Sequence, residues 1–158
     1  MTGKGSLNHN SRKFHAKNTD PNRTHWNVEY CNEDIKDVYH ELFDDALKRY
    51  NDKQTRKDRK IDDYYEKIRS GKQEKLFHEV ILQIGDKDNM GSETMEGQLA
   101  AKILDEYMKG FQERNPTLRV FAAHLHLDEA TPHLHIDFIP YVTGSKRGLD
   151  TRVSLKQA

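Results

Sequence analysis

The sequence predicts an α+β domain in which an antiparallel sheet carries helices on one face. Segments with apolar residues at alternate positions, typical of strands, are interspersed with segments in which apolar residues recur every three or four positions, typical of helices. The predicted order is strand, helix, helix, strand, helix, strand, strand. A short polar connection joins the last two strands, which favours antiparallel pairing.

The N-terminal quarter contains one predicted strand. Residues 1–22 are rich in Gly, Asn, Ser and Lys, so we expect them to form a loop or mobile arm outside the core. Residues 24–32 alternate Trp26, Val28 and Tyr30 with polar neighbours, which indicates a half-buried strand.

Two predicted helices follow. The first starts at Glu33 and the second covers residues 61–69. Between them, residues 51–60 have no apolar side chain and form either a solvated connection or a DNA-facing arm. The expected core stripe of the first helix consists of Ile35, Val38, Tyr39, Leu42, Phe43, Ala46, Leu47 and Tyr50.

In the second half of the chain, the residue pattern predicts a central strand at residues 75–85 and a long helix at 93–114. Two final strands are predicted at 118–127 and 133–142. A glycine-bounded basic loop at residues 144–149 suits a contact with a DNA backbone. The expected core stripe of the long helix consists of Met95, Leu99, Ile103, Tyr107 and Phe111.

Composition predicts one domain with one modest core. The chain has 158 residues, of which 34% are hydrophobic and 33% charged, and its net charge is zero. The overall charge therefore does not indicate a nucleic-acid partner, although both ends of the chain are basic. Cys31 is the only cysteine, which excludes an internal disulfide and a cysteine zinc site. Without a leader or a long apolar run, we expect a cytoplasmic protein with no membrane segment.

Histidines gather on the last two predicted strands. Because side chains alternate with period two, His133 and His135 share one face, as His124 and His126 do on the preceding strand. A hairpin would bring His126 opposite the other pair, and three imidazoles with free coordination positions suit a catalytic metal. Buried histidines are more often satisfied core residues, but the convergence of several favours a ligand set of His126, His133 and His135. We expect this metal site on the face of the sheet opposite the helices, and we expect His124 to matter less.

Three segments resemble one family. The string His126-Leu-Asp-Glu-Ala-Thr-Pro-His133-Leu-His135 resembles the metal-binding motif of HUH endonucleases, in the form found in MobV (Pre/Mob) plasmid mobilisation and recombination relaxases. His9-Asn10-Ser11-Arg12 is similar to the H-N-x-R motif of those relaxases, whose histidine is taken as the nucleophile. A segment similar to residues 20–27 follows it in that family.

The resemblance implies an HUH relaxase domain over residues 1–158 that nicks DNA and transfers strands. His9 would attack the phosphate and stay joined to the DNA 5′ phosphate, Arg12 would hold the phosphate, and Glu129 would take or orient the proton of the nucleophile. Manganese or magnesium is favoured only by the resemblance. We expect Asp128 and Asp137 to support the ligand histidines. The residues expected to contact DNA are Arg12, Arg23, Lys146 and Arg147.

Several alternatives stay open. Tyr64 and Tyr65 are possible nucleophiles, since some HUH enzymes use helical tyrosines, but their spacing with neighbouring isoleucines favours packing in the core. Glu79 in the central strand has a side chain that could face the site. The protein could instead be a metal-dependent hydrolase that activates water, or a DNA-binding module without cleavage. We also expect the chain to continue beyond residue 158, with possible oligomerisation through that region.

Overall fold

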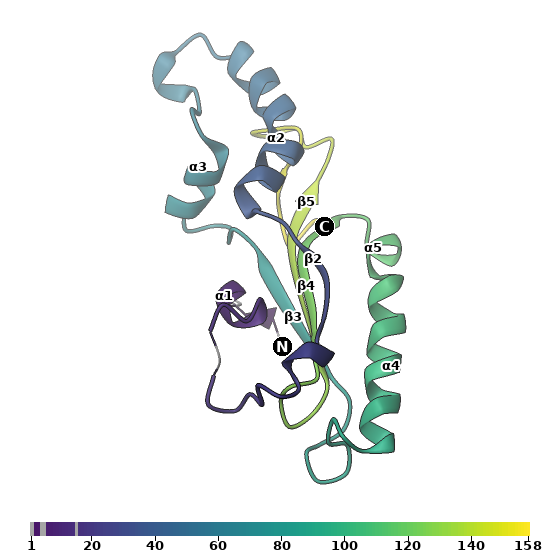
Figure 1. Cartoon of the computed structure of the whole chain (residues 1–158). Coiled ribbons are helices and arrows are strands. Elements are labelled where there is room, and N and C mark those ends of the chain that lie inside the picture. The colour runs from purple at the N-terminus through teal and green to yellow at the C-terminus, as the bar shows by residue number, and fades with distance from the viewer. Residues whose placement is uncertain (1, 4–5, 15) are drawn as a thin grey trace.

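The fold is built on an antiparallel sheet. The computed structural model describes residues 2–3, 6–14 and 16–158. Within that part of the chain the strands are ordered β1-β3-β5-β4-β2, and β6 pairs with β5. Figure 1 shows the long strands side by side, with helices on either side of them. The strands are β1 (Thr2–Gly3), β2 (Val28–Asn32), β3 (His78–Gln83), β4 (Leu118–His126), β5 (His133–Val142) and β6 (Arg152–Val153).

Helices begin where side chains can cap them. The α-helices are α1 (Leu7–Asn10), α2 (Ile35–Asp52), α3 (Tyr64–Ser70), α4 (Met95–Lys109) and α5 (Phe111–Arg114). Asp34, Asp63 and Thr94 each accept a backbone N–H in the first turn of α2, α3 and α4, which satisfies a donor that the helix leaves free. None of the described helices is long and apolar enough to cross a membrane.

The β4–β5 hairpin confirms the predicted arrangement of the histidines. Both strands are antiparallel, with His124 paired with His135 and His126 paired with His133. The predicted strand at residues 24–32 is shorter than expected, because Thr24–Trp26 form a 3-10 turn before β2 begins.

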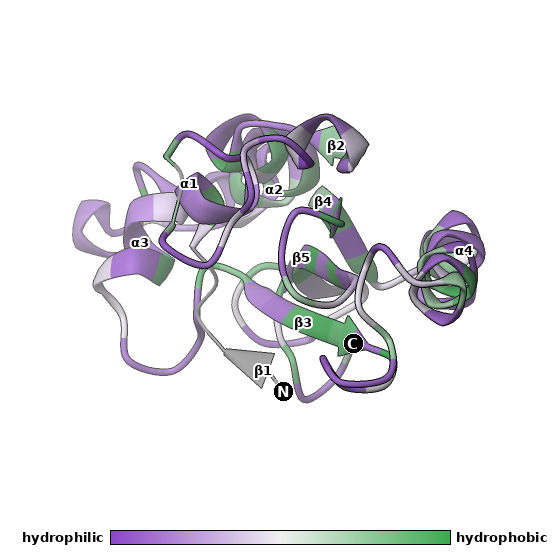
Figure 2. Ribbon diagram, turned by 60° about the horizontal axis from the view of Figure 1, so that its bottom comes forward, coloured by the Kyte–Doolittle hydropathy of each residue, from purple (hydrophilic) through white to green (hydrophobic). Residues whose placement is uncertain are grey.

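Helices lie on both faces of the sheet. The α+β class and the antiparallel sheet are as predicted, and Figure 2 shows α4 on one side of the sheet and α1, α2 and α3 on the other. The histidines lie on the face opposite α4 and α5. However, α2 and α3 share the histidine face, where they cover Phe121 and Ile139. The site therefore occupies only one end of that face, and the division of helices differs from the single helical face expected. The reason is that β4 and β5 extend beyond the histidines, and there both faces of the two strands carry apolar side chains.

The predicted stripe of α2 is confirmed as core. Val38, Tyr39, Phe43 and Ala46 are at most 2% exposed, and the other predicted stripe residues pack against them. Tyr64 and Tyr65 of α3 pack edge to face against Phe43 and Tyr39 respectively. This packing matches the structural interpretation of the two tyrosines.

The structure divides the predicted helix 93–114 into α4 and α5, and its predicted stripe is wrong except at Phe111, which lies in α5. Its other members are 40% to 84% exposed, and a second row on another side of the helix is buried instead. That row contains small residues that let α4 approach its neighbours closely; a Cβ on Gly97 would clash with the Gly91 carbonyl oxygen. The exposed row is Met95, Leu99, Ile103 and Tyr107, and the buried row is Gly97, Ala100, Leu104 and Met108.

The N-terminal segment is held on the sheet rather than extending from it. Leu7 packs against the α2–α3 core, and Asn10 is 1% exposed. Further along, the backbone N–H of Asp20 donates to the Asp128 carbonyl at 2.7 Å. The expectation of an arm outside the core fails here because polar side chains, which sequence patterns assign to solvent, bond to buried polar groups of the sheet.

Candidate metal and nucleophile site

Three buried imidazoles converge on the β4–β5 hairpin. His126, His133 and His135 are 1%, 9% and 6% exposed, and each offers a nitrogen within 4.8 Å of the other two. Their ring centroids are 4.8 to 5.2 Å apart. The hairpin register brings the rings together, because directly paired residues on antiparallel strands project from the same face.

Each of the three imidazole rings uses one nitrogen in a hydrogen bond. His126 Nε2 is 2.8 Å from the Asn10 carbonyl oxygen, and His133 Nδ1 is 2.9 Å from that of Thr131. His135 Nδ1 is 2.8 Å from Glu79 Oε1. Carbonyl oxygens only accept, so the hydrogens of His126 and His133 lie on those nitrogens and the opposite nitrogens keep a lone pair.

The unused nitrogens fit a metal ion. Among the described side chains, His126 Nδ1 and His135 Nε2 are buried without a hydrogen-bond partner. Leaving a buried polar atom unpaired is costly, and a cation would satisfy both. Neutral imidazoles oriented by oxygen acceptors are the usual setting of histidine metal ligands.

The protonation states of the buried groups suit a bound cation. Burial lowers the pKa of His126 to about 3, so this ring stays neutral near pH 7. Burial alone would raise the pKa of Glu79, but hydrogen bonds from His135 and Asn10 outweigh it and lower that pKa. Burial, followed by repulsion from Glu79, raises the pKa of Asp137 to about 7.

The supporting acids are not the ones predicted. Asp137 accepts from Asn10 at 3.1 Å, and Asp128 pairs with Arg12; neither contacts a ligand histidine. Glu79 fills that role, because the register of β3 against β5 places it on the histidine face. Asn10 joins the groups: its amide donates to Glu79 at 2.7 Å, and its carbonyl orients His126.

His9 lies beside the three histidines. Its Nε2 is 3.3 Å from Glu129 Oε1, and its ring centroid is 5.9 Å from that of His126 and 6.3 Å from that of His135. Burial, then the positive charge of Arg12, lowers the pKa of His9, so its ring is neutral near pH 7. Short helix α1 places it there.

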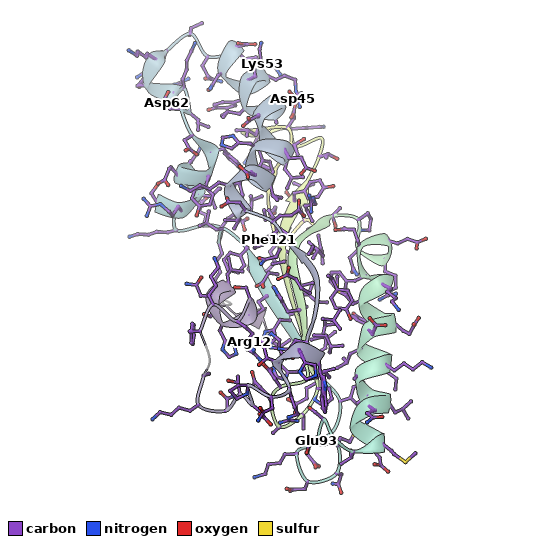
Figure 3. All side chains as sticks on the ribbon, viewed as in Figure 1. Arg12, Asp45, Lys53, Asp62, Glu93 and Phe121 are labelled. Carbon is purple, nitrogen blue, oxygen red and sulfur yellow. The ribbon has the colours of Figure 1, made fainter. Side chains whose placement is uncertain are left out.

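Arg12 ties this segment to the hairpin connection. Its Nε and Nη2 bond both oxygens of Asp128, at 2.9 and 2.5 Å, and Nη2 also reaches Glu129 at 2.9 Å. Arg12 has φ 52°, a conformation that costs energy for a non-glycine residue and persists where contacts enforce it. Figure 3 shows Arg12 beside α1 at the end of the sheet away from α2 and α3. Its fork is thus engaged by carboxylates of the protein.

The carboxylates around Arg12 stay ionised. Burial would raise the pKa of Glu129, but His133 and Arg12 outweigh it and hold that pKa at about 2. Burial would also raise the pKa of Asp128, but its hydrogen bonds, first of all that from Arg12, outweigh burial and hold that pKa at about 2. Glu129 is therefore a negative group between His9 and the ligand cluster, 3.6 Å from His133 Nε2.

The structure does not bring the other predicted residues to the cluster. His124 Nε2 pairs with Glu29 at 3.1 Å and is outside the ligand group, in line with its lesser expected role. Arg23 pairs with Asp20 at 3.2 Å. Lys146 and Arg147 are exposed in the loop after β5. The ten residues of β5 separate that loop from the hairpin connection, which at strand rise is roughly 30 Å.

Sequence reasoning missed Asn10, Thr131 and the central role of Glu79. Asn10 lies inside the motif that starts at His9, but its short polar side chain gave no reason to expect burial. The orientation of Glu79 could not be decided from the sequence, because only strand pairing determines which face of β3 meets the histidines.

Comparison with known proteins agrees with this geometry. The family model Mob_Pre, described as plasmid recombination enzyme, matches residues 4–157. A curated plasmid recombination enzyme from Streptococcus agalactiae is 24% identical over 159 residues. That match covers 96% of this chain and 28% of the relative.

Solved structures with the same fold include the MobM relaxase domain. Two Mn-bound crystal structures of it with a 22-nucleotide oriT DNA of plasmid pMV158, at pH 5.5 and 4.6, are 27% and 26% identical, with TM-scores of 0.53 and 0.52. The match covers 95% of this chain and 66% of theirs. This chain thus spans less than two thirds of either kind of relative.

Proposed function

The chain belongs to the Mob_Pre family of plasmid recombination enzymes, and from this membership and the site geometry we propose that it is a DNA relaxase. The proposed activity is to nick one DNA strand at a specific site, to hold the new 5′ phosphate covalently, and to rejoin or transfer that strand. It would serve mobilisation or recombination of a plasmid or other mobile element. The names of the relatives, which mention plasmid recombination, a relaxase domain and oriT DNA, support this class of reaction.

The position of His9 is the observation that carries the proposal. The neutral imidazole of His9 lies 3.3 Å from the ionised Glu129 carboxylate. Its ring centroid is 5.9 Å and 6.3 Å from those of two candidate metal ligands, His126 and His135. A phosphate bound at the three histidines would be within reach of His9. The alternative nucleophiles are placed badly: Tyr64 is 8% exposed, and its oxygen accepts from the Val153 backbone.

His126, His133 and His135 would hold one divalent ion. When bound, such an ion polarises the scissile phosphate as a Lewis acid and neutralises developing charge. Manganese is favoured because the solved relatives are Mn-bound.

The proposed step balances without a cofactor that supplies energy. The free nitrogen of His9 attacks phosphorus, a nitrogen–phosphorus bond forms, and the bond from phosphorus to the 3′ oxygen breaks. The leaving 3′ oxygen takes the electron pair of the broken bond and, through solvent, a proton that balances the one given up by His9, and becomes a 3′ hydroxyl. Glu129 accepts the remaining ring proton of His9 or orients the ring. Attack by a 3′ hydroxyl on the phosphoramidate reverses the step and joins strands.

Arg12 is assigned a positioning role in this proposal. Because its fork bonds Asp128 and Glu129, it fixes the backbone that carries His9 and holds Glu129 in place. Together with burial, its charge keeps His9 neutral. Its remaining nitrogen, Nη1, is 3.2 Å from His9 Nε2 and donates to the His9 carbonyl at 3.0 Å, so direct phosphate contact by Arg12 would require one of its bonds to open.

DNA is the proposed substrate, and its backbone would meet basic residues away from the metal. Arg23, Lys146 and Arg147 stay candidates for phosphate contacts. The roughly 30 Å between the hairpin connection and the loop of Lys146 corresponds to about nine nucleotide steps of a duplex, so that loop would contact DNA well away from the nick.

Acid lability of a covalent adduct tests the proposal. A candidate origin oligonucleotide labelled at its 3′ end should transfer label to the protein in the presence of Mn²⁺, whereas a 5′ label should stay on a free fragment. Mild acid should release the label, because a phosphoramidate is acid-labile and a tyrosine phosphodiester is not. His9→Ala should abolish the adduct, and Tyr64→Phe should retain it.

Other outcomes separate the rival classes. Cleavage by His9→Ala without any adduct would support a hydrolase that activates water. DNA binding without cleavage in the wild-type protein would support a binding module. His40→Ala is the control for loss of a histidine, because His40 is exposed on α2 and pairs only with Asp44 among the described residues.

A further inference from the structure

Two apolar side chains border the polar site. Phe14 is 50% exposed, and its ring centroid is 5.9 Å from that of His9. Ile81 is 37% exposed and pairs directly with His135 across β3 and β5, so both project from the same face. Neither takes part in the proposed chemistry. Single exposed apolar residues are ordinary, but these two flank the nucleophile and a metal ligand.

A cavity opens beside Ile81 and the proposed catalytic groups. It has a volume of about 280 Å³, near the lower end of ligand pockets and suited to one small group. Its lining joins the catalytic groups to β3: His9, Glu129, His133, His135, Ile81 and Gln83 line it, together with Asn18, Ala130 and Thr131. A phosphate at the histidines would therefore place the adjoining sugar and base over Ile81 and Gln83.

We infer that this cavity and the Phe14 ring hold the unstacked base of a nucleotide next to the scissile phosphate. The inference rests on the proposed function for the location of that phosphate. Ile81 provides an apolar surface for the base, and the exposed aromatic ring of Phe14, next to His9 in the cavity lining, provides a stacking platform. Extracting one base from its neighbours would fix the phosphate relative to His9.

Gln83 is placed to contact the edge of that base. It pairs with His133 across the strands and is exposed beside the cavity. Its amide nitrogen donates to the Gly85 carbonyl at 3.1 Å, which fixes the group and leaves its oxygen to accept from a base. Asn18 is held in a similar way, with its amide donating to Glu129 at 2.7 Å. Base preference at the nick would therefore come from two fixed amides.

Mononucleotides test this inference without knowledge of the DNA target. On Mn²⁺-loaded protein, the four deoxynucleoside 5′-monophosphates should bind more tightly than 2-deoxyribose 5-phosphate, which lacks a base. Stacking of one base predicts a difference of roughly 5- to 150-fold. Phe14→Ala should remove most of that difference and leave the affinity of the sugar phosphate and of Mn²⁺ unchanged.

Matched variants identify the kind of contact. Phe14→Trp should retain the base preference, whereas Phe14→Leu should retain less of it, because leucine is apolar without a stacking face. Tyr107→Ala is the control for loss of an exposed aromatic, since Tyr107 is 40% exposed on α4, on the opposite face. Ile81→Ser should weaken the preference, and Gln83→Ala should narrow the differences among the four bases.

Three results would each overturn the inference. They are equal binding of nucleotides and sugar phosphate, absence of nucleotide binding, and tighter binding of nucleotides than of sugar phosphate that persists in Phe14→Ala. These results are separate from failure of the relaxase proposal. A protein that cleaves DNA but shows no base preference refutes only the base site. A protein that shows the preference but neither cleaves DNA nor forms an adduct refutes only the relaxase activity.

Discussion

The two faces of the β4–β5 hairpin are both buried but carry side chains of opposite polarity. On one face Leu125, Leu134 and Ile136 are at most 2% exposed and pack with Leu104 and Met108 of α4. On the other face, the ligand histidines are at most 9% exposed.

The difference between the faces teaches that burial alone does not reveal what a residue does. The apolar row needs only partners of suitable size, and α4 and α5 supply them. The polar row needs an acceptor for each N–H, and three separate segments supply these acceptors through Asn10, Thr131 and Glu79. Two nitrogens left over after this pairing, His126 Nδ1 and His135 Nε2, belong to the candidate metal ligands. Variants on the two faces should therefore separate stability from metal binding.

The largest effect is expected from His133→Ala. Loss of one of three ligands should weaken Mn²⁺ binding by more than about 100-fold, which exceeds the effect of a typical supporting residue, and should abolish cleavage. Titration of Mn²⁺ by calorimetry measures the first quantity. His124→Ala, on the same face but outside the ligand group, is the control and should bind Mn²⁺ normally. Stoichiometric metal in His133→Ala would refute the ligand assignment.

Leu134→Ala should have the opposite signature. Leu134 is 0% exposed, so truncation should cost about 2–5 kcal/mol of unfolding free energy, while the folded protein keeps its affinity for Mn²⁺. Urea denaturation measures the loss. Leu99→Ala provides the contrast, because Leu99 is 60% exposed on α4 and should change stability by no more than about 0.5 kcal/mol. A costly Leu99→Ala would mean that another surface covers this row.

The acid response of the metal-free protein should depend on Asp137. His126 has a lowered pKa, so its contribution to stability is present above pH 6.5 and is lost as the pH falls. Asp137 has a raised pKa of about 7, so its contribution is present at low pH and is lost as the pH rises toward 7. Between pH 7 and pH 5 these contributions oppose each other.

Asp137→Asn removes one side of this balance. Compared with the wild type, the variant should lose about 2 kcal/mol more unfolding free energy between pH 7 and pH 5. Urea denaturation at the two pH values, with chelator present, measures the difference. An identical pH response in both proteins would show that Asp137 is already ionised at pH 5.

Glu79→Gln tests whether the acceptors of the polar row matter. The variant preserves size but removes the negative charge beside His135 Nδ1, so Mn²⁺ affinity should fall by about 10- to 100-fold. Calorimetric titration measures the change. Glu29→Gln is the matched control, because Glu29 pairs with His124, which is outside the ligand group. Equal Mn²⁺ affinity in both variants would mean that Glu79 does not support the ligand.

The smallest effect is expected at the far end of β5. Replacing Lys146 and Arg147 with alanine should weaken binding of unrelated DNA sequences alike and reduce the salt slope by up to about 1.8, with no change in Mn²⁺ affinity. Fluorescence anisotropy at several salt concentrations measures the slope. Alanine at Lys102 and Lys109 of α4 is the control. An effect confined to one DNA sequence would assign Lys146 and Arg147 to base recognition instead.

Sequence reasoning was sufficient where neighbouring residues decide the outcome. Period-two alternation fixed the common face of His133 and His135, and a short connection fixed the hairpin that brings His126 to them. The same reasoning placed the α2 stripe correctly, because that helix has only one apolar side. The motif around His9 supplied a candidate nucleophile, but only through resemblance.

Only the tertiary structure decided contacts between segments far apart in the chain. Helix α4 has two rows of apolar or small residues, and packing against the sheet selected the row with Gly97 and Leu104. Arg12 meets Asp128 across 116 residues, and His135 meets Glu79 across 56. Periodicity fixes where a side chain points relative to its own helix or strand, whereas its partner depends on how distant elements pack. The sequence alone therefore determined the candidate metal ligands, and the fold determined the groups that orient them.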